Sequence, residues 1–221
     1  YDLSGKVLWD PTPDDRIRIS FLNIYNKIAY DEQGQVGASV EVKTSSLEQR
    51  SQAGGISISH KWSSAWITNL EGNISSYSLA AVNQDVSNEQ RLLQENDVVE
   101  LYGGIDTEWL FSKQLRLPAG YQFRETGITN FDEINNPTFS RFVKEVIRTH
   151  AGFMEGEYNS PDSKTHFSAG LRMNYYDKLS EFRLEPRVTV SRKLARYMTF
   201  ELQGEMKSQV TTQVIDFQRD F

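Results

Sequence analysis

The chain has 221 residues, a formal net charge of -6 and no cysteine. The missing cysteines exclude a disulfide scaffold, a zinc knuckle and a thiol enzyme. The mild acidity leaves no basic stripe for nucleic acid, and no run approaches the roughly 20 apolar residues of a membrane helix. No signal peptide precedes the first patterned stretch, so we expect a cytosolic, processed or truncated chain.

Short runs of alternating apolar and polar residues fill the first half of the chain. Such a period of two is typical of β-strands with one apolar face. The runs lie at 1–9, 16–22, 53–62, 66–77, 99–111 and 115–125. The polar stretches at 30–46, 80–97 and 126–145 lack this period. We therefore expect these three stretches to be long loops.

The alternation is clearest in three successive runs between residues 164 and 207. One face of these runs carries apolar residues such as Phe167, Leu171, Leu184, Val188 and Phe200. The opposite face carries the charges that we predict to line an inner wall, which are Arg172, Arg183, Glu185, Arg187, Glu201 and Glu205.

The turn between the second and third of these runs sets which charges meet. With a turn of about five residues, at 192–196, Arg187 faces Glu201 and Arg183 faces Glu205. Cross-strand pairs of opposite charge help to fix the register of a sheet. Pro186 lies inside a strand without an N–H to donate, so we expect a bulge or a local ladder defect there.

A charged inner wall with an apolar outer wall is typical of an antiparallel, up-and-down transmembrane β-barrel. We count about ten strands of roughly 9 to 13 residues, long enough to cross a bilayer at a tilt. Short turns alternate with longer connections, as outer-membrane barrels require. All four tryptophans lie beside short turns, and we expect them to form an aromatic girdle at one interface: Trp9, Trp62, Trp66 and Trp109.

Two other classes remain open on the pattern alone. Alternating strands also build soluble sandwiches and lipocalin-like binding modules, in which Ile105, Leu171, Val188 and Phe200 would be buried by protein. A complete small barrel of about ten strands could act as a surface enzyme or a porin-like channel. Against that class, no histidine lies at an outer rim beside an aspartate, and the two ends do not resemble strands ready to close.

Motifs for catalysis or cofactor binding are missing from the sequence. It has no phosphate loop, Gly-x-Ser-x-Gly elbow, His-Glu-x-x-His or cysteine pair. The histidines His60, His150 and His166 are scattered, and neighbouring ones do not stand at matching heights for a metal. We therefore expect no enzyme, no catalytic residue, no cofactor and no metal site.

Five stretches carry more than periodicity. They are SFLNIYNKIAYDE (20–32), VNQDVSNEQRLLQEN (82–96), GYQFRETGITNFDEINNPTFSRFVKEVIRTHAGF (120–153), FRLEPRVTVSRKL (182–194) and GEMKSQVTTQVIDFQRDF (204–221). These stretches resemble the barrel of TonB-dependent outer-membrane receptors, and the Leu-Glu-Pro-Arg stretch at 184–187 is the most family-like. The resemblance covers most of the chain.

The resemblance implies a 22-stranded barrel with an N-terminal plug, which imports a siderophore, cobalamin or glycan with energy from the TonB complex. The chain has fewer than half the strands and neither plug nor TonB box, so residues 1–221 are expected to be part of such a barrel domain. An open arc would leave unpaired edges in lipid. The implied partners are outer-membrane lipid, the plug, the remaining strands, periplasmic TonB and a small-molecule substrate.

Overall fold

The computed structural model describes residues 1–31, 43–85 and 89–208, which form one antiparallel sheet of ten strands. Each strand pairs with its neighbours in the sequence, so the predicted all-β, up-and-down order is confirmed. The strands are β1 (Asp2–Trp9), β2 (Asp15–Asp31), β3 (Lys43–Ser63), β4 (Trp66–Asp85), β5 (Gln90–Leu110), β6 (Leu115–Asn135), β7 (Thr138–Asn159), β8 (Thr165–Tyr176), β9 (Glu181–Ala195) and β10 (Met198–Glu205). A short 3-10 turn, η1 (Asp177–Leu179), joins β8 to β9. Within the described ranges, no helix is long and apolar enough to cross a membrane.

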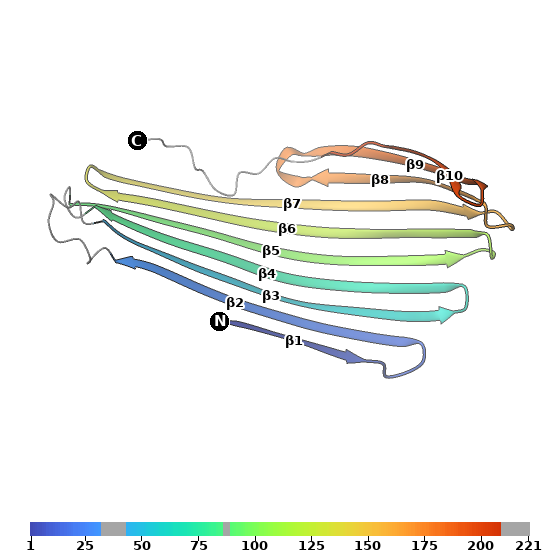
Figure 1. Cartoon of the computed structure of the whole chain (residues 1–221), viewed down its shortest axis with the longest axis horizontal. Coiled ribbons are helices and arrows are strands. Elements are labelled where there is room, and N and C mark those ends of the chain that lie inside the picture. The colour runs from blue at the N-terminus through green and yellow to red at the C-terminus, as the bar shows by residue number, and fades with distance from the viewer. Residues whose placement is uncertain (32–42, 86–88, 209–221) are drawn as a thin grey trace.

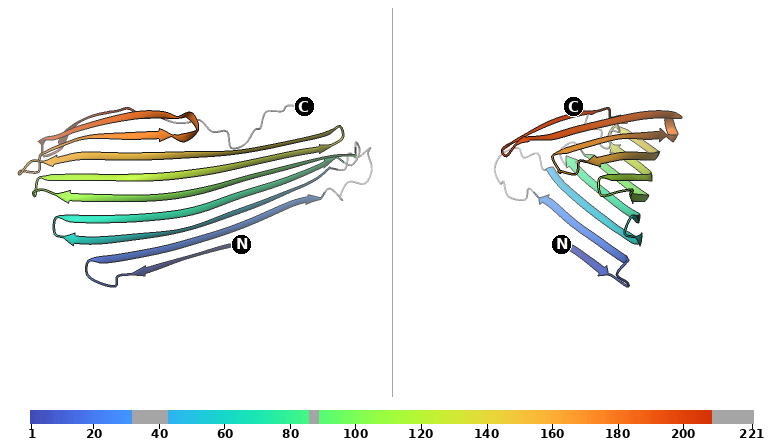
Figure 2. Two further views of the ribbon diagram at one scale, coloured as in Figure 1. Left: turned by 180° about the vertical axis from the view of Figure 1, so that it is seen from behind. Right: turned by 90° about the vertical axis from the view of Figure 1, so that its right-hand side faces the viewer.

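The sheet is curved. Strands β2 to β7 run side by side along the long axis, and the shorter β8, β9 and β10 continue the sheet at one side (Figure 1). Seen from the end, the sheet bends so that β8 to β10 turn over one side of it (Figure 2). The right-handed twist of strands accumulates into such curvature. The sheet therefore has a concave and a convex face.

The two faces differ in chemistry, because successive side chains of a strand point to opposite faces. On the convex face, apolar side chains lie open, with 49% of Leu171 and 53% of Phe200 exposed. On the concave face, the polar residues Ser168 and Asn174 are only 5% exposed. A sandwich would bury the first set against a second sheet, whereas the described residues form a single sheet that leaves this set exposed.

The edges of the sheet are β1 and β10. The described residues show no pairing between these two strands, which a closed ten-stranded barrel would require. The described part of the chain is therefore an open arc.

Most strands are longer than the sequence predicted. Strands β2 to β7 have 17 to 22 residues instead of roughly 9 to 13. The expected loop at 126–145 is the upper part of the β6–β7 hairpin, which turns at Asn136 and Pro137. The expected loop at 80–97 belongs to β4 and β5 in its described part, and the middle of the expected loop at 30–46 lies outside the described residues. Both faces of these strand ends mix polar and apolar residues, so the apolar–polar period disappears although the pairing continues.

The register of β9 and β10 also differs from the prediction. Glu205 stands opposite Arg187, and Glu201 stands opposite Ser191, so the predicted pairs of Arg187 with Glu201 and Arg183 with Glu205 are wrong. Strand β9 continues to Ala195, and a tight turn with a register shift between Met198 and Thr199 replaces the expected five-residue turn. A slip by an even number of residues leaves every side chain on its predicted face.

Pro186 causes no bulge. The β8–β9 register runs without a shift through the pair Leu171 and Pro186. The Pro186 carbonyl accepts a hydrogen bond from the Met206 N–H at 3.0 Å, so its missing N–H would point to the same side, next to the last β9–β10 pair. The ladder already ends on that side, and it loses nothing there.

Candidate functional site: the concave polar wall

Apolar residues on the convex face form a belt of limited extent along the strands, and positions on the opposite, polar face are described relative to it. Along β3, β4, β6 and β7 the convex face is mainly apolar or aromatic over nine residues each, at 54–62, 66–74, 115–123 and 150–158. Beyond these points the convex side chains become polar, at Gln52, Ser76, Glu125 and Arg148. Nine to eleven residues are what a tilted strand needs to cross a bilayer. The strand ends beyond the belt therefore project from it.

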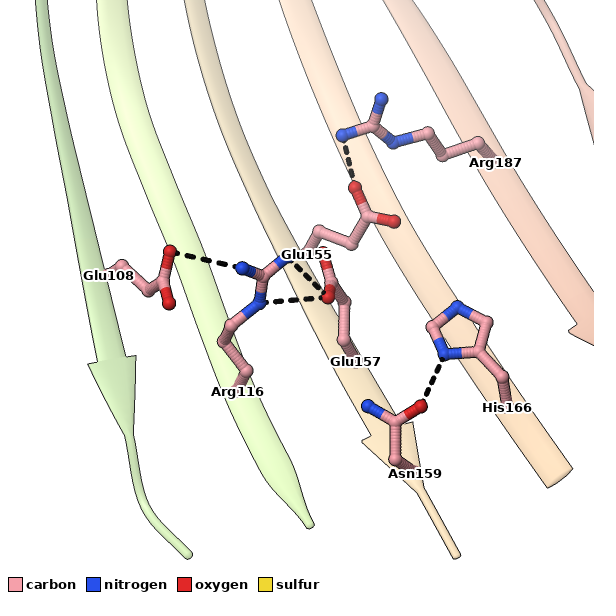
Figure 3. A network of polar contacts seen from close by, with 7 residues as sticks. All are labelled: Glu108, Arg116, Glu155, Glu157, Asn159, His166 and Arg187. Atoms are coloured by element: carbon pink, nitrogen blue, oxygen red, sulfur yellow. Dashed lines mark hydrogen bonds and ion pairs between the residues drawn. The ribbon is translucent and has the colours of Figure 1, made fainter. Parts of the chain in front are cut away.

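Ion pairs lie across the concave face near the short-turn end of the belt (Figure 3). The Arg116 guanidinium on β6 bridges two strands, at 3.2 Å from Glu108 on β5 and 2.7 Å from Glu157 on β7. Arg187 on β9 forms an ion pair with Glu155 on β7. These pairs connect β5, β6, β7 and β9. We call the five residues the lower ion-pair cluster, where lower means nearer to the short turns of the sheet.

A glycine allows the pair between Arg187 and Glu155 to form. Arg187 and Glu155 both stand opposite Gly170 on the intervening strand β8. A Cβ atom at Gly170 would lie 3.1 Å from the Cβ of Glu155 and 3.2 Å from the Nε of Arg187. The two charged side chains thus meet over a backbone that carries no side chain. A side chain at this position would separate them.

A hollow of about 520 Å³ lies higher on the concave face, between β5 and β9. The charged, amide and tyrosine side chains that line it are Glu100, Tyr102, Gln122, Arg124, Arg172, Asn174, Tyr176 and Glu185. Its floor includes Ala151, which is 2% exposed and stands between Gln122 and Asn174 in the pairing. A small residue between two amides leaves the space that these side chains surround.

Two guanidinium groups with different partners face this hollow. Arg172 donates from Nη2 to Gln122 Oε1 at 2.9 Å and from Nε to Asn174 Oδ1 at 3.0 Å. Arg124 lies 5.9 Å from the centre of the Tyr102 ring and 3.9 Å from the Glu100 carboxylate. Glu185, by contrast, accepts hydrogen bonds from the N–H and the hydroxyl of Ser208.

The six predicted inner-wall charges all belong to the three runs of β8, β9 and β10, but they meet in different places. Arg172 and Glu185 face the hollow, and Arg187 joins the lower ion-pair cluster. Arg183 pairs with Glu181 on its own strand at 2.6 Å, and Glu205 pairs with Lys207 at 2.7 Å. Glu201 stands opposite Ser191.

Sequence reasoning missed the acidic side of the lower ion-pair cluster. Glu155 and Glu157 lie between 148 and 158, where the alternation is weak, and the sequence pattern does not link them to Arg116 and Glu108. Their spacing held a usable signal, because Glu155 and Glu157 share one face and alternate with Met154 and Gly156. The pairing that connects them to Arg116 and Arg187 depends on register, which the sequence did not determine.

The tryptophans gather in part. Trp62 and Trp66 stack at 5.2 Å between ring centres, and Trp66 and Trp109 stack at 6.0 Å. Trp9 lies at the β1 end and is 58% exposed, outside this stack. These rings lie beside short turns, at the lower end of the apolar belt. Their role as a membrane-interface girdle stays a prediction.

The same end of the sheet holds an ordered turn. Asp162 accepts a hydrogen bond from the Ser160 hydroxyl at 2.5 Å and from the Lys164 N–H at 3.1 Å. The Ser160 hydroxyl is the main cause of a lowered pKa of the Asp162 carboxyl. A side chain that bonds its own turn in this way fixes a short connection.

The histidines lie apart. His60 contacts Asp15 at 2.6 Å, His150 contacts the Tyr121 hydroxyl at 2.6 Å and His166 contacts Asn159 at 3.0 Å. Among the described residues, no group of three or more His, Cys, Asp or Glu side chains is placed to hold a metal ion.

Comparison with known proteins gives a likeness of fold. No protein-family model matches the chain, and no curated protein matches it. The crystal structure of BauA, the ferric preacinetobactin receptor from Acinetobacter baumannii, matches with a TM-score of 0.63 and 12% sequence identity. The match covers 90% of this chain and 38% of that one, so the chain spans well under half the length of BauA. At this identity the likeness concerns the fold alone.

Proposed function

We propose that the chain is part of the barrel wall of a TonB-dependent outer-membrane receptor that imports a scarce nutrient of the siderophore, cobalamin or glycan class. The observation that carries this proposal is the two-faced sheet. Its convex face has an exposed apolar belt of about nine residues per strand, and its concave face is polar and ion-paired. Lipid fits the first face, and a hydrated lumen or a plug fits the second.

Two further observations support this function over other barrel classes. Strands β2 to β7 extend well past the belt at one end, which is the form of long outer hairpins that could reach a ligand. The fold also resembles that of BauA over 90% of this chain. The unpaired edges β1 and β10 would be completed by further strands, because open edges are not tolerated in hydrocarbon.

In this proposal each part of the wall has a separate task. The belt contacts outer-membrane lipid, and the lower ion-pair cluster of Glu108, Arg116, Glu155, Glu157 and Arg187 faces a plug domain. The plug in turn connects to TonB in the periplasm. The projecting hairpins and the hollow face the incoming nutrient.

The test is energy-coupled uptake by the source bacterium. A strain without the gene and its complemented counterpart are grown under limitation for iron with siderophores, for cobalamin, or for glycan carbon. We expect the protein in the outer-membrane fraction and one nutrient whose uptake needs both the gene and the proton gradient across the inner membrane.

Two results would contradict the proposal. One is recovery of the native protein in the soluble fraction without detergent. The other is nutrient uptake that depends on the gene but continues after a protonophore collapses the gradient. The second result would indicate a passive porin-like channel instead.

A further inference from the structure

The upper part of β7 has no strand beside it on one side. Strand β7 pairs with β6 from Thr138 down to Tyr158, whereas it pairs with β8 only from Thr149 downward. Because η1 joins β8 to β9 at that height, β7 extends past both of them (Figure 1). Within the described residues, no strand pairs with 138–146 on the β8 side, and we call this stretch the free edge of β7. Both neighbours of β7 belong to the described chain, so the gap is a feature of the sheet and not of its ends.

The backbone groups that point to the free edge follow from bonds lower on the strand. The Ser160 N–H, just past β7, donates to the Thr165 carbonyl on the β8 side at 2.8 Å. The Asn159 N–H donates to the Gln114 carbonyl on the β6 side at 2.8 Å. Such bonds alternate from one residue to the next in an antiparallel sheet, and neither ladder of β7 shifts register. The even-numbered residues therefore turn their N–H and C=O groups to the free edge: Ser140, Phe142, Lys144 and Val146.

The side chains of the free edge favour the addition of another strand. Phe142 is 63% exposed and Val146 is 40% exposed. Aromatic and β-branched residues pack well against a neighbouring strand. A row of unpaired N–H and C=O groups flanked by such side chains is a template for strand addition. The free edge therefore fits an extended segment as its occupant.

The chain itself runs toward the free edge in the right direction. Because the order is antiparallel throughout, β10 runs opposite to β7. After β10, the Met206 N–H donates to the Pro186 carbonyl on β9 at 3.0 Å. The Ser208 hydroxyl then lies 3.3 Å from the Tyr176 hydroxyl, and Tyr176 pairs with Thr149 just below the free edge. The chain at Ser208 is therefore close to the lower end of the free edge.

The next residues of the chain, 209–221, lie outside the described part, and their sequence has the length and composition for this place. The free edge of nine residues is about 30 Å long at roughly 3.3 Å per residue, and the thirteen residues after Ser208 exceed it by four. Seven of the thirteen are β-branched or aromatic, and none is glycine or proline, in the sequence QVTTQVIDFQRDF.

A second copy of the chain is a poorer occupant of the free edge. Two copies that insert into one membrane in the same sense hold their β7 strands parallel, and parallel pairing is the less stable kind. The chain that follows β10 runs opposite to β7 and needs no second molecule. Direction therefore favours residues of the same chain.

We propose that residues 211–219 add to the free edge of β7 as an antiparallel strand, above the β8–β9 hairpin. Through Tyr176, Ser208 stands at the level of Thr149. Residues 209 and 210 pass η1, and a chain that rises one residue at a time then brings Thr211 opposite Val146. The inference rests on the sheet alone and does not need the import function.

This register also matches side chains across the two strands. It sets Ile215 opposite Phe142, which pairs an apolar with an aromatic side chain. It sets Asp216 opposite Arg141, which pairs opposite charges. The added strand continues the wall of long strands above the short hairpin, and it protects β7 from pairing with other molecules.

The experiment is disulfide trapping in the purified full-length protein. In the proposed register Val143 faces Val214, so Val143→Cys with Val214→Cys should form a disulfide within one molecule on oxidation with copper phenanthroline. The matched control is Val143→Cys with Val210→Cys, a valine on the same face but four residues, or about 13 Å, lower. A disulfide needs Cα atoms within about 7 Å, so we expect at least about fivefold more linked peptide from the first pair, measured by mass spectrometry.

Hydrogen exchange of the wild-type protein tests the same pairing without a substitution. The amides of Val143 and Glu145 bond to β6, and those of Phe142, Lys144 and Val146 point to the free edge. With the strand added, both sets should exchange roughly a hundredfold more slowly than unstructured amides. The amides that bond to β6 serve as the internal control, because they are protected with or without the added strand.

Three results would overturn the inference. One is no excess of the disulfide between positions 143 and 214 over the disulfide between positions 143 and 210. Another is fast exchange at the amides that point to the free edge beside slow exchange at those that bond to β6, which would mean an open edge. The third is a disulfide between two molecules that carry Val143→Cys alone as the main product, which would assign the edge to a second copy.

Discussion

Gly170 is the residue on which the ion pair between Arg187 and Glu155 depends. A branched side chain there would meet atoms that a Cβ already approaches at 3.1 and 3.2 Å. We predict that Gly170→Val lowers the free energy of unfolding by about 1–3 kcal/mol, through overpacking and loss of the pair. The measurement is the urea midpoint of the full-length protein in detergent, with the slope checked for a constant value.

The control for this prediction lies on the convex face. A Cβ at Gly152 meets nothing within 4 Å, so Gly152→Val adds a strand-forming side chain without a clash. It should leave the urea midpoint unchanged or raise it. If both valine variants shift the midpoint equally, the effect comes from general glycine loss and not from the pair over Gly170.

At the scale of elements, the β6–β7 hairpin shows what alternation can and cannot detect. The lower part alternates, with Leu117, Tyr121 and Phe123 on one face, and its strand was predicted correctly. The upper part pairs just as regularly, from Thr126 opposite Ile147 to Asn135 opposite Thr138. Its two faces are both mixed, because neither meets an apolar surface, so the sequence carries no period there. Pairing partners, not side-chain pattern, keep it extended.

Hydrogen exchange separates a paired hairpin from the long loop that the sequence suggested. Backbone amides of 126–135 and 138–146 that bond across β6 and β7 should exchange roughly a hundredfold more slowly than unstructured amides. The Lys113 amide, in the short turn between β5 and β6, should exchange faster and serve as an internal reference. Rapid exchange throughout 126–146 would mean that the projecting hairpin is not formed in solution.

At the scale of the whole molecule, the sequence predicted the sheet class, the strand order and the face of most side chains, because all of these follow from a period of two. It did not predict which charges meet. Arg187 was expected opposite Glu201, but the tight turn after Ala195 places it opposite Glu205. Its ion pair is instead with Glu155, across Gly170. A change in turn length shifts which residues of β9 and β10 stand opposite each other but keeps each side chain on its face. No residue pattern near 192–197 distinguished the two registers.

The proposed placement of the sheet in a bilayer gives a prediction for the molecule as a whole. The 221-residue chain has no cysteine, so single cysteines introduced into it can carry a nitroxide label. In β4, Ile74 is convex and 56% exposed, and Ser75 follows it on the concave face. Val188 and Thr189 form the same kind of pair in β9. Ser78 shares the face of Ile74 but lies beyond the belt.

Oxygen concentrates in hydrocarbon, whereas a charged nickel chelate stays in water. In membranes, labels at Ile74 and Val188 should collide with oxygen more often than labels at Ser75 and Thr189, because in the proposed barrel only the first pair faces lipid. The label at Ser78 should respond mainly to the nickel chelate, because the convex face there is polar and projects above the belt. A plug inside the barrel would lower both collision rates at Ser75 and Thr189, and it would leave the alternation intact. Equal oxygen collisions at Ile74, Ser75 and Ser78 would contradict a membrane-spanning belt, since one convex face would then show no boundary along β4.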